Sequence, residues 1–518
     1  MEKIRKLPIG IQNFEKLRKE GYLYVDKTQF IWELISRGCV YFLSRPRRFG
    51  KSLLLSTMRA FFEGKKELFD GLYIGEQETE WIKYPVFYFD FNTQKYKDKF
   101  DLEEILKNYF NKWEKEFDLD NQNLSLPLRF KYLLEKAHEK TGLEVVVLID
   151  EYDKSMLESD VENLKEMRDT FKAVFSNLKS ADEHLKFVFV TGITRFTKVS
   201  IFSELNNLKD ISLTDRYAEI CGLTQEEIKA TFSPEIESLA EENDLTVDEA
   251  LCELEKMYDG YHFSEKGKGL YNPFSLLNAL DEGKFKSYWF DSGTPTFLVE
   301  KVKKENYHIQ NFTDGIWRSY EDLKDYQIEN PDIIPLFYQT GYLTIKDYDK
   351  RHNEYFLKYP NEEVKNAFLK LLVPFVFPKN KYSSLDIAKF DDDLCDGEIE
   401  SVMKRLQSLF ATLPYATKNS DEITEQNFQN VIYLVFLLLG QFVKVEHHYS
   451  HGRADCVVEN ANYVYLFEFK RDKSADEALA QIEASRYADS YTADPRKLVK
   501  IGANFSSEER NLVEWKVV

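Results

Sequence analysis

Four short apolar runs in the first 220 residues constrain the fold more than any other feature of this chain. They lie at residues 39–43, 85–91, 145–149 and 187–191, with helical stretches between them. Strands buried on both faces of a parallel sheet appear as continuous apolar runs rather than as an alternating pattern. The sequence therefore predicts an α/β fold, with a parallel sheet and crossover helices over residues 1–220.

A basic loop follows the first of these runs. Residues 45–52 read Arg-Pro-Arg-Arg-Phe-Gly-Lys-Ser and precede a helical stretch at 53–62. In a phosphate-binding loop, the amides of the loop and of the helix N-terminus point at phosphate oxygens, a lysine reaches the β- and γ-phosphates, and a serine ligates Mg²⁺. Lys51 and Ser52 fit these two roles, but Arg45 stands where the usual signature has its first glycine. A basic loop that only caps a helix is the alternative.

Two carboxylates, Asp150 and Glu151, come directly after the third apolar run. We expect Asp150 to hold the Mg²⁺ shell and Glu151 to orient the attacking water, because phosphoryl transfer needs a positioned nucleophile beside a metal. An isolated Asp-Glu pair also often caps the next helix. Combined with Lys51 earlier in the same α/β pattern, the pair favours binding and hydrolysis of ATP.

The fourth run ends in candidates for contact with a γ-phosphate. Thr191 and Thr194 are candidates for a polar side chain that senses this phosphate, and helix capping is the alternative. Arg195 and Arg216 are candidates for an arginine finger, although an ordinary surface arginine is the commoner case.

From residue 221 to 385 the pattern changes to mostly helices. Thr224 and Glu227 form a capping-box pattern, which predicts the start of a helix. Aromatic residues and a glycine cluster at residues 258–263, Tyr-Asp-Gly-Tyr-His-Phe. We expect residues 221–385 to form a helical connector, and a winged helix is a candidate for its fold.

After a polar stretch near residues 380–392 the order of elements changes again. The sequence predicts a helix at about 424–439, strands at 441–449, 453–458 and 463–470, a helix at 474–488 and a strand at 498–505. Residues 459–462, Glu-Asn-Ala-Asn, predict a hairpin between the second and third of these strands. The expected domains are 1–220, 221–385 and 386–518.

Charged residues interrupt the apolar strands of the last region. Glu468 and Lys470 are two residues apart on one strand, so they face the same side, and Asp455 lies near Glu468 if the hairpin closes as expected. Charges on a buried strand face are costly unless they are paired or bind a metal. The pattern favours phosphodiester cleavage, with Asp455 and Glu468 holding Mg²⁺ and Lys470 orienting the water or steadying phosphate charge. A salt bridge between Lys470 and one acid is the simpler alternative.

Cysteine and histidine spacing argues against a thiolate or zinc site. The five cysteines are far apart and form no Cys-x-x-Cys, as expected in a reducing compartment. His447, His448 and His451 lack a suitably spaced fourth ligand. The start of the chain has no apolar signal region, and the longest apolar run, 431–439, is too short to span a bilayer. We expect a soluble cytoplasmic protein without a membrane partner.

The net charge of −19 argues against a protein that coats nucleic acid, but this charge is unevenly distributed. Residues 1–60 carry +8, residues 61–439 carry −25 and residues 440–518 carry −2. The basic N-terminal region fits a phosphate-binding loop. The nearly neutral C-terminal region weakens the case for a nucleic-acid substrate without excluding it.

The order of the N-terminal segments resembles the bacterial AAA-ATPase-like proteins, relatives of the AAA+ and STAND P-loop ATPases. The matching segments are Tyr24-Val25-Asp26-Lys27-Thr28, residues 45–52, Asp150-Glu151-Tyr152-Asp153 and residues 191–194. The resemblance covers residues 5–220 and extends through 258–263, and that family shows the same loop without the first glycine. It implies ATP and Mg²⁺ as cofactors and Glu151 as a catalytic residue. The implied binding residues are Arg47, Arg48, Phe49, Gly50, Lys51, Ser52, Leu53, Asp150 and Thr194.

Residues 395–518 resemble the PD-(D/E)XK nuclease superfamily in the D…E-x-K spacing and in the helix–strand–strand–strand–helix–strand order. Gln481 and Tyr487 match a Gln-x5-Tyr pattern that many of its members share. The resemblance implies a catalytic set of Asp455, Glu468 and Lys470 with an auxiliary Gln481, and Glu425 is the candidate for an acid on the first helix.

Two functions are compatible with the sequence. The first is a P-loop ATPase joined to a Mg²⁺-dependent nuclease that acts on DNA or RNA. The second is a slow nucleotide switch whose nuclease-like domain binds without cleaving. Because AAA-like rings place an arginine at a neighbour's site, a homo-oligomer is a further expectation.

Overall fold

The computed structural model describes the two compact units of the chain over most of their length. The described residues are 5–158, 161–195, 207–289, 315–324, 333–368, 384–411, 448–449, 452–453, 456–485, 487–509 and 511–518. The N-terminal unit comprises residues 1–293 and 315–364, and the C-terminal unit comprises 294–314 and 365–518. The domain boundary expected near residue 220 lies inside the N-terminal unit, and the boundary expected near 385 lies inside the C-terminal unit.

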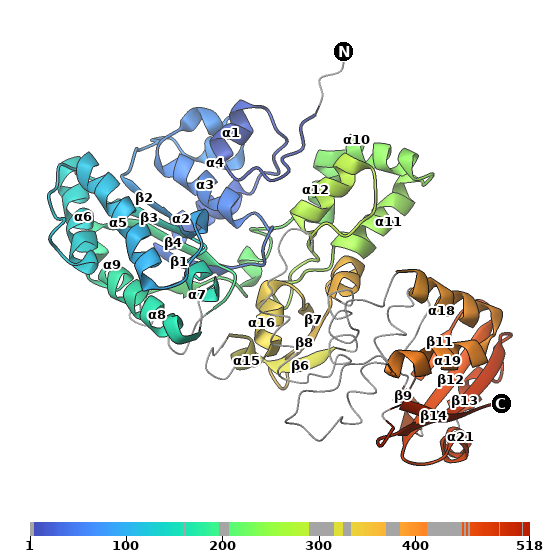
Figure 1. The fold of residues 1–518 in the computed structure, drawn as a ribbon. Coiled ribbons are helices and arrows are strands. Elements are labelled where there is room, and N and C mark those ends of the chain that lie inside the picture. Colours follow the sequence, from blue (N-terminus) through green and yellow to red (C-terminus); the bar gives the residue numbers. More distant parts are fainter. Residues whose placement is uncertain are drawn as a thin grey trace. The chain divides into compact units, whose positions relative to one another are not determined.

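A five-stranded parallel sheet forms the centre of the N-terminal unit (Figure 1). Its strands are β1 (Val40–Ser44), β2 (Val86–Asp90), β3 (Val145–Asp150), β4 (Leu185–Gly192) and β5 (Lys209–Asp210), in the order β2-β3-β4-β1-β5. All neighbouring pairs run parallel. The predicted α/β class is therefore confirmed. The first four strands lie within two residues of the apolar runs, whereas β5 is too short to produce such a run.

Helices connect these strands. They are α1 (Phe14–Lys19), α2 (Thr28–Arg37), α3 (Lys51–Phe62), α4 (Tyr73–Gln77), α5 (Lys99–Glu116), α6 (Leu126–Thr141), α7 (Lys154–Glu158), α8 (Val161–Phe175) and α9 (Asn177–Ser180). Short 3₁₀ turns lie between them at η1 (Lys66–Phe69), η2 (Phe91–Thr93), η3 (Asp182–His184) and η4 (Asp215–Tyr217).

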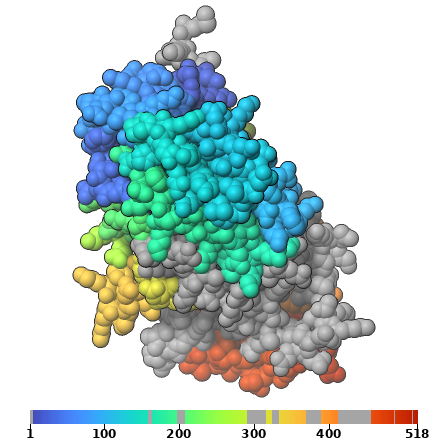
Figure 2. Space-filling model, turned by 90° about the vertical axis from the view of Figure 1, so that its left-hand side faces the viewer, coloured from blue at the N-terminus to red at the C-terminus, as the bar shows by residue number. Residues whose placement is uncertain are grey.

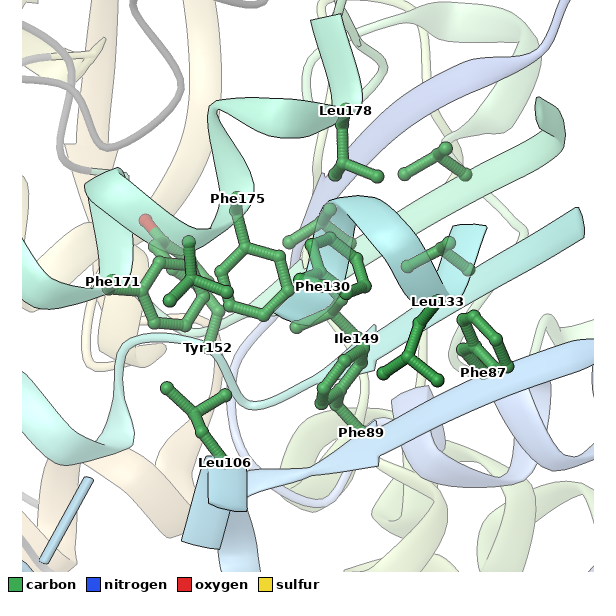
Figure 3. Packing of buried hydrophobic residues seen from close by; sticks show 14 of the residues in the cluster. Phe87, Phe89, Leu106, Phe130, Leu133, Ile149, Tyr152, Phe171, Phe175 and Leu178 are labelled. Carbon is green, nitrogen blue, oxygen red and sulfur yellow. The ribbon is translucent and has the colours of Figure 1, made fainter. Parts of the chain in front are cut away.

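A large hydrophobic core lies between the sheet and helices α5, α6 and α8 (Figure 3). The ring of Phe89 on β2 lies 5.8 Å from Phe130 of α6 and 5.2 Å from Phe175 of α8, centroid to centroid. Ile149 of β3 is fully buried in the same cluster. Burying each such side chain contributes about 1.5–3 kcal/mol, so this packing fixes the positions of β2 and β3. The blue-green surface of these helices faces the viewer in Figure 2.

Three helices follow the sheet: α10 (Gln225–Glu242), α11 (Val247–Tyr258) and α12 (Pro273–Glu282). The predicted capping box starts α10. The Thr224 hydroxyl accepts from the amide of Glu227 at 3.2 Å, and the Glu227 carboxylate accepts from the amide of Thr224 at 2.8 Å. This satisfies two backbone donors that a helix start otherwise leaves without partners.

A small antiparallel sheet completes the N-terminal unit. Its strands are β6 (Ile316–Ser319), β7 (Thr344–Asp349) and β8 (Glu354–Lys358), in the order β6-β8-β7, and it is accompanied by α15 (Tyr320–Lys324), α16 (Ile333–Thr340) and a helix at 362–368. The sequence analysis missed this sheet because its strands are short and partly exposed. Helices beside a small antiparallel sheet are compatible with a winged helix, which stays a prediction.

A four-stranded mixed sheet forms the core of the C-terminal unit. Its strands are β11 (Cys456–Glu459), β12 (Tyr463–Arg471), β13 (Lys497–Ser506) and β14 (Asn511–Val517), in that order. Helix α21 (Ala475–Ala484) and turn η6 (Tyr487–Tyr491) connect β12 to its parallel neighbour β13, and α21 packs Ile482 against Leu466. Helices α18 (Ser384–Asp396) and α19 (Ile399–Phe410) and the short pair β9 (His448–Tyr449) and β10 (Gly452–Arg453) complete the described part.

The predicted hairpin at residues 459–462 is confirmed. Asn460 Oδ1 accepts from the amides of Asn462 at 2.9 Å and Tyr463 at 2.7 Å, and β11 pairs antiparallel with β12. The sequence analysis did not expect β14. The predicted helix at 424–439 and most of the strand at 441–449 lie outside the described residues.

Two features bear on the cellular setting. Within the described part of the chain, no helix is long and apolar enough to cross a membrane. All five cysteines lie within the described residues, and none of them forms a disulfide.

Candidate nucleotide site and candidate nuclease-like site

The loop between β1 and α3 forms a concave backbone at the start of α3. Arg48 has φ of 69° and Gly50 has φ of 91°, and the helix begins at Lys51. A Cβ at position 50 would meet nothing within 4 Å, so glycine is needed there for its backbone conformation rather than for space. Amides in such a turn form a nest for an anion, and the helix N-terminus adds partial positive charge. This backbone is suited to phosphate.

Lys51 folds back over this loop. Its side chain is buried, and Nζ donates to the carbonyl oxygens of Arg45 at 2.9 Å and Pro46 at 3.0 Å. A buried ammonium group needs such acceptors or an anion. The two carbonyls therefore hold the lysine head group at the loop, where it can exchange them for phosphate oxygens.

Asp150 and Glu151 lie where β3 ends. Asp150 is buried and accepts a hydrogen bond from the hydroxyl of Thr191 on β4 at 2.7 Å. Burial raises the pKa of the Glu151 carboxyl, while the nearby charge of Lys51 opposes that shift. The structure therefore brings Glu151 close enough to Lys51 for their charges to interact, as the sequence predicts.

A cavity of about 360 Å³ adjoins the loop, within the size range of small-molecule sites. Its polar lining comes from the N-terminal segment, the loop and the segments after β2 and β3: Gln12, Lys27, Arg47, Arg48, Lys51, Ser52, Asn92, Glu151 and Lys154. Its apolar lining comes from the N-terminal segment and from the region of α10 and α12: Ile11, Leu23, Val25, Ile220, Leu223, Phe232, Phe274 and Leu277. Phosphate-binding groups beside apolar side chains suit a nucleotide, which has a charged chain and a flat base.

Arg45 accounts for the missing glycine of the loop signature. Its guanidinium is buried and lies 4.2 Å from the ring centroid of Phe263. It donates to four backbone carbonyls, those of Ser44, Ser212, Tyr217 and Ala218, at 2.8–3.3 Å. Arg45 therefore fastens the loop to the segment that follows β5 instead of binding phosphate.

The second site lies on β12 of the C-terminal unit. Glu468 is buried, and Lys470 donates from Nζ to Glu468 Oε1 at 3.0 Å and also to the side-chain oxygen of Gln481 on α21. Three of the four residues that the sequence assigns to this site therefore lie together. Asp455 lies outside the described residues, and the β11–β12 pairing is described from Cys456 opposite Phe467 onward.

Gly502 allows α21 to approach this site. It pairs in register with Glu468, and a Cβ there would lie 2.5 Å from the carbonyl oxygen of Ala475 and 2.8 Å from Leu479. Only glycine permits so close a contact between helix and sheet. The close packing places Gln481 within hydrogen-bonding reach of Lys470.

Comparison with known proteins matches both regions. Residues 8–202 match the family described as "Predicted AAA-ATPase" (AAA-ATPase-like), and residues 423–515 match the PD-(D/E)XK nuclease superfamily. A protein of Azotobacter chroococcum mcd 1, described as "Uncharacterized protein in vnfD 5'region", is 35% identical over 522 residues that cover 99% of each chain. This chain belongs to the AAA-ATPase-like family. Its C-terminal region belongs to the PD-(D/E)XK nuclease superfamily, so both resemblances are confirmed.

In this AAA-ATPase-like protein, most residues of the predicted nucleotide set line the cavity. They are Arg47, Arg48, Phe49, Gly50, Lys51, Ser52 and Leu53 of the loop, together with Glu151. Asp150 and Thr194 belong to the predicted set but are not among the described residues that line the cavity. Asp150 nevertheless lies directly beside Glu151 at the same strand end.

Thr194 contacts Asp153 rather than the cavity. Its amide and its hydroxyl both donate to Asp153 Oδ2 at 2.6 Å, and the amide of Ile193 donates to the same oxygen at 3.0 Å. Burial raises the pKa of the Asp153 carboxyl despite these donors. Of the two predicted threonines, Thr191 is the one that contacts Asp150.

The two candidate arginine fingers differ in burial. Arg195 is 7% exposed, forms an ion pair with Asp210, and donates its amide to Gln339 at 3.0 Å. The expectation of an ordinary surface arginine is therefore wrong for Arg195, which is a buried structural residue. Arg216 is half exposed and lies 3.9 Å from Glu33. Neither arginine is among the described residues that line the cavity.

The sequence analysis missed Asn92 and Lys154 as cavity residues. Lys154 donates from Nζ to the carbonyl oxygen of Asn92 at 3.3 Å and also to its side-chain oxygen. Asn92 follows β2, whose last residue, Asp90, pairs in register with Asp150. The second apolar run of the sequence therefore indicated that the residues after it lie near Asp150, since the carboxyl ends of parallel strands meet at one edge of the sheet.

The predicted metal ligands of the C-terminal region are only partly described. Among the described residues, no group of three or more His, Cys, Asp and Glu side chains is arranged to hold a metal ion. The predicted ligand Asp455 and the candidate acid Glu425 lie outside that part of the chain, as do His447 and His451, for which no metal was expected.

Proposed function

We propose that this protein binds ATP with Mg²⁺ and hydrolyses it, and that its PD-(D/E)XK domain cleaves nucleic acid with Mg²⁺. The observation that carries the first part is the cavity that joins Lys51 and Ser52 of the loop to Glu151 at the end of β3. Domains at 1–220, 221–385 and 386–518 and a cytoplasmic setting are part of the proposal, and thiols without disulfides fit a reducing compartment.

The chain supplies each group that phosphoryl transfer requires. The loop amides and Lys51 bind the phosphates, and Ser52 and Asp150 are the residues that hold Mg²⁺. When bound, the metal neutralises charge on the β- and γ-phosphates. Thr191 orients Asp150 through its hydroxyl, and Glu151 accepts the proton of the attacking water.

The C-terminal set supports a metal-dependent nuclease. Glu468 and Asp455 are the carboxylates that hold Mg²⁺, which stabilises the charge of the pentavalent phosphate when bound. Lys470 positions the water or the scissile phosphate, and Gln481 orients Lys470 through the hydrogen bond between their side chains. Whether the substrate is DNA or RNA is decided by experiment.

Calorimetry and a phosphate-release assay test the ATPase. We expect micromolar or tighter ATP binding that Lys51→Ala abolishes, because this change removes the only lysine at the loop. Glu151→Gln should retain binding and lose at least 100-fold in kcat, since it keeps the shape but removes the base. Lys179→Ala, which changes an exposed lysine of α9, is the control. Wild-type protein that binds no ATP, or Glu151→Gln at wild-type rate, contradicts the proposal.

Digestion of labelled DNA and RNA with Mg²⁺ tests the nuclease. Asp455→Ala and Lys470→Ala should each remove cleavage while leaving ATP turnover intact, and the exposed Lys516→Ala should cleave normally. Equal cleavage by wild type and both variants would mean that a contaminant is responsible. Tight ATP binding without turnover, combined with no cleavage of either nucleic acid, would instead support a nucleotide switch whose nuclease-like domain only binds.

A further inference from the structure

The phosphate loop packs against aromatic rings of the helical region. Phe49, directly before Gly50, packs edge-on against Tyr261 and Phe263, with ring centroids 4.8 Å and 5.3 Å away. The guanidinium of Arg45 lies over the same Phe263 ring at 4.2 Å. Phe49 and both of its partners are buried. Two side chains of the loop therefore rest on two rings of the segment at residues 258–263.

Further contacts attach the loop to the same region. The carbonyl oxygen of Phe49 accepts from the amide of Gly222 at 3.2 Å, and that of Arg47 accepts from Trp289 Nε1 at 3.4 Å. The guanidinium of Arg48 lies 4.8 Å from the ring centroid of Phe274. The loop is thus held to the helical region through its side chains and its carbonyl oxygens.

The segment at 258–263 is itself rigidly supported. Tyr258 donates its hydroxyl to the carbonyl oxygen of Lys286 at 2.8 Å, and Lys346 of β7 donates to the carbonyl oxygen of Gly260 at 3.0 Å. The amide of His262 donates to the hydroxyl of Thr344 at 2.7 Å. Contacts from β7 and from the segment after α12 hold residues 258–263 in place, so their rings form a fixed surface for the loop.

We propose that Tyr261 and Phe263 are positioning residues of the nucleotide site, which hold the phosphate loop in the conformation that binds ATP. The inference rests on the proposed ATP binding. A loop that adopts its binding conformation only part of the time binds with an affinity reduced by that fraction. The rings keep the fraction high, so the affinity for ATP is set by the helical region as well as by the loop.

Calorimetric titration of three variants with ATP and Mg²⁺ tests this role. Tyr261→Leu loses the ring pair and is expected to raise the Kd for ATP about tenfold, equivalent to about 1.4 kcal/mol. Tyr261→Phe keeps the ring and should stay within twofold of wild type. Leu254→Ala, in the buried core of α11, also removes buried side-chain atoms but does not touch the loop, and it should stay within twofold.

A Kd unchanged in Tyr261→Leu, or raised equally in Leu254→Ala, overturns the inference. Hydrogen exchange of the amides at residues 45–53 without nucleotide gives a second readout. We expect faster exchange in Tyr261→Leu and in Phe263→Leu than in Leu254→Ala, and equal rates also overturn the inference. If the wild-type protein binds no ATP, the proposed function is refuted. If the variants still show this exchange pattern, the aromatic rings hold the loop in place whatever it binds.

Discussion

At the scale of single residues, Arg45 shows how a departure from a sequence signature is compensated. The sequence alone marks Arg45 as a misfit in a phosphate loop, because nothing in its neighbours reveals its acceptors. The four carbonyls and the Phe263 ring that hold its guanidinium come from residues more than 160 positions away, apart from Ser44. Long-range contacts of this kind are invisible to local pattern reading. Lys51, Ser52 and Glu151, in contrast, were predictable because their chemistry depends on local spacing.

Restoring the signature glycine at this position should damage the protein. Arg45→Gly removes a buried guanidinium together with the hydrogen bonds that it donates to four backbone carbonyls, so we expect the free energy of unfolding to fall by about 3 kcal/mol or more. Chemical denaturation measures this change, with the half-exposed Arg216→Ala as a control near zero. An equal or higher stability for Arg45→Gly would refute the anchoring role of Arg45.

Asp259 predicts a pH dependence of stability. Burial raises the pKa of its carboxyl from 3.8 to about 6, with the charge of Lys346 opposing this. Between these two values the native state binds more protons than the unfolded state, so stability falls as pH rises from about 4 to about 6. The loss is of the order of 2–3 kcal/mol. Denaturation at a series of pH values should show that Asp259→Asn removes this fall, and a variant with the wild-type pH profile would contradict the assignment.

At the scale of elements, the sequence identified what was long and apolar and missed what was short. The strands β1 to β4 were predictable because each coincides with an apolar run of the sequence. The strands of the β6-β8-β7 sheet were missed because they are short and partly exposed, so their local pattern resembles that of loops. The β11–β12 hairpin was predictable from the turn at Asn460, whose side chain closes it.

Gly502 supports a prediction about the packing of α21. Gly502→Ala places a Cβ against Ala475 and Leu479, so we expect a loss of about 1–3 kcal/mol in the free energy of unfolding. The rate of nucleic-acid cleavage should fall by more than the loss of folded protein explains, because displacement of α21 separates Gln481 from Lys470. Lys473→Ala, an exposed change before α21, is the control for both assays. A fully active Gly502→Ala variant would show that this close contact is not needed.

At the scale of the whole molecule, charge is divided between regions with different tasks. Residues 1–60 carry +8 and residues 440–518 carry −2. Tight binding to phosphates along a duplex usually needs an excess of lysine and arginine. We therefore expect the C-terminal unit to bind nucleic acid through few phosphate contacts. The logarithm of the binding constant should fall with the logarithm of salt concentration with a slope shallower than about −3. A slope near −6 in fluorescence-anisotropy titrations would contradict this expectation.

A contact between distant segments of the N-terminal unit is also visible at this scale. The buried Glu363 accepts from the amides of Tyr288 at 2.5 Å and Trp289 at 2.9 Å, and Trp289 in turn donates to the carbonyl oxygen of Arg47 in the loop. The sequence did not predict this contact, because it joins three segments that are far apart along the chain.

The central claim is that ATP binds at the loop between β1 and α3. A crystal structure of the full chain with a non-hydrolysable ATP analogue and Mg²⁺ tests this claim. We predict phosphate density at the N-terminus of α3, with Lys51 Nζ moved from the carbonyl oxygens of Arg45 and Pro46 to phosphate oxygens, and with the metal beside Ser52 and Asp150. Analogue density away from this loop, or a loop without density at saturating analogue, would contradict the account.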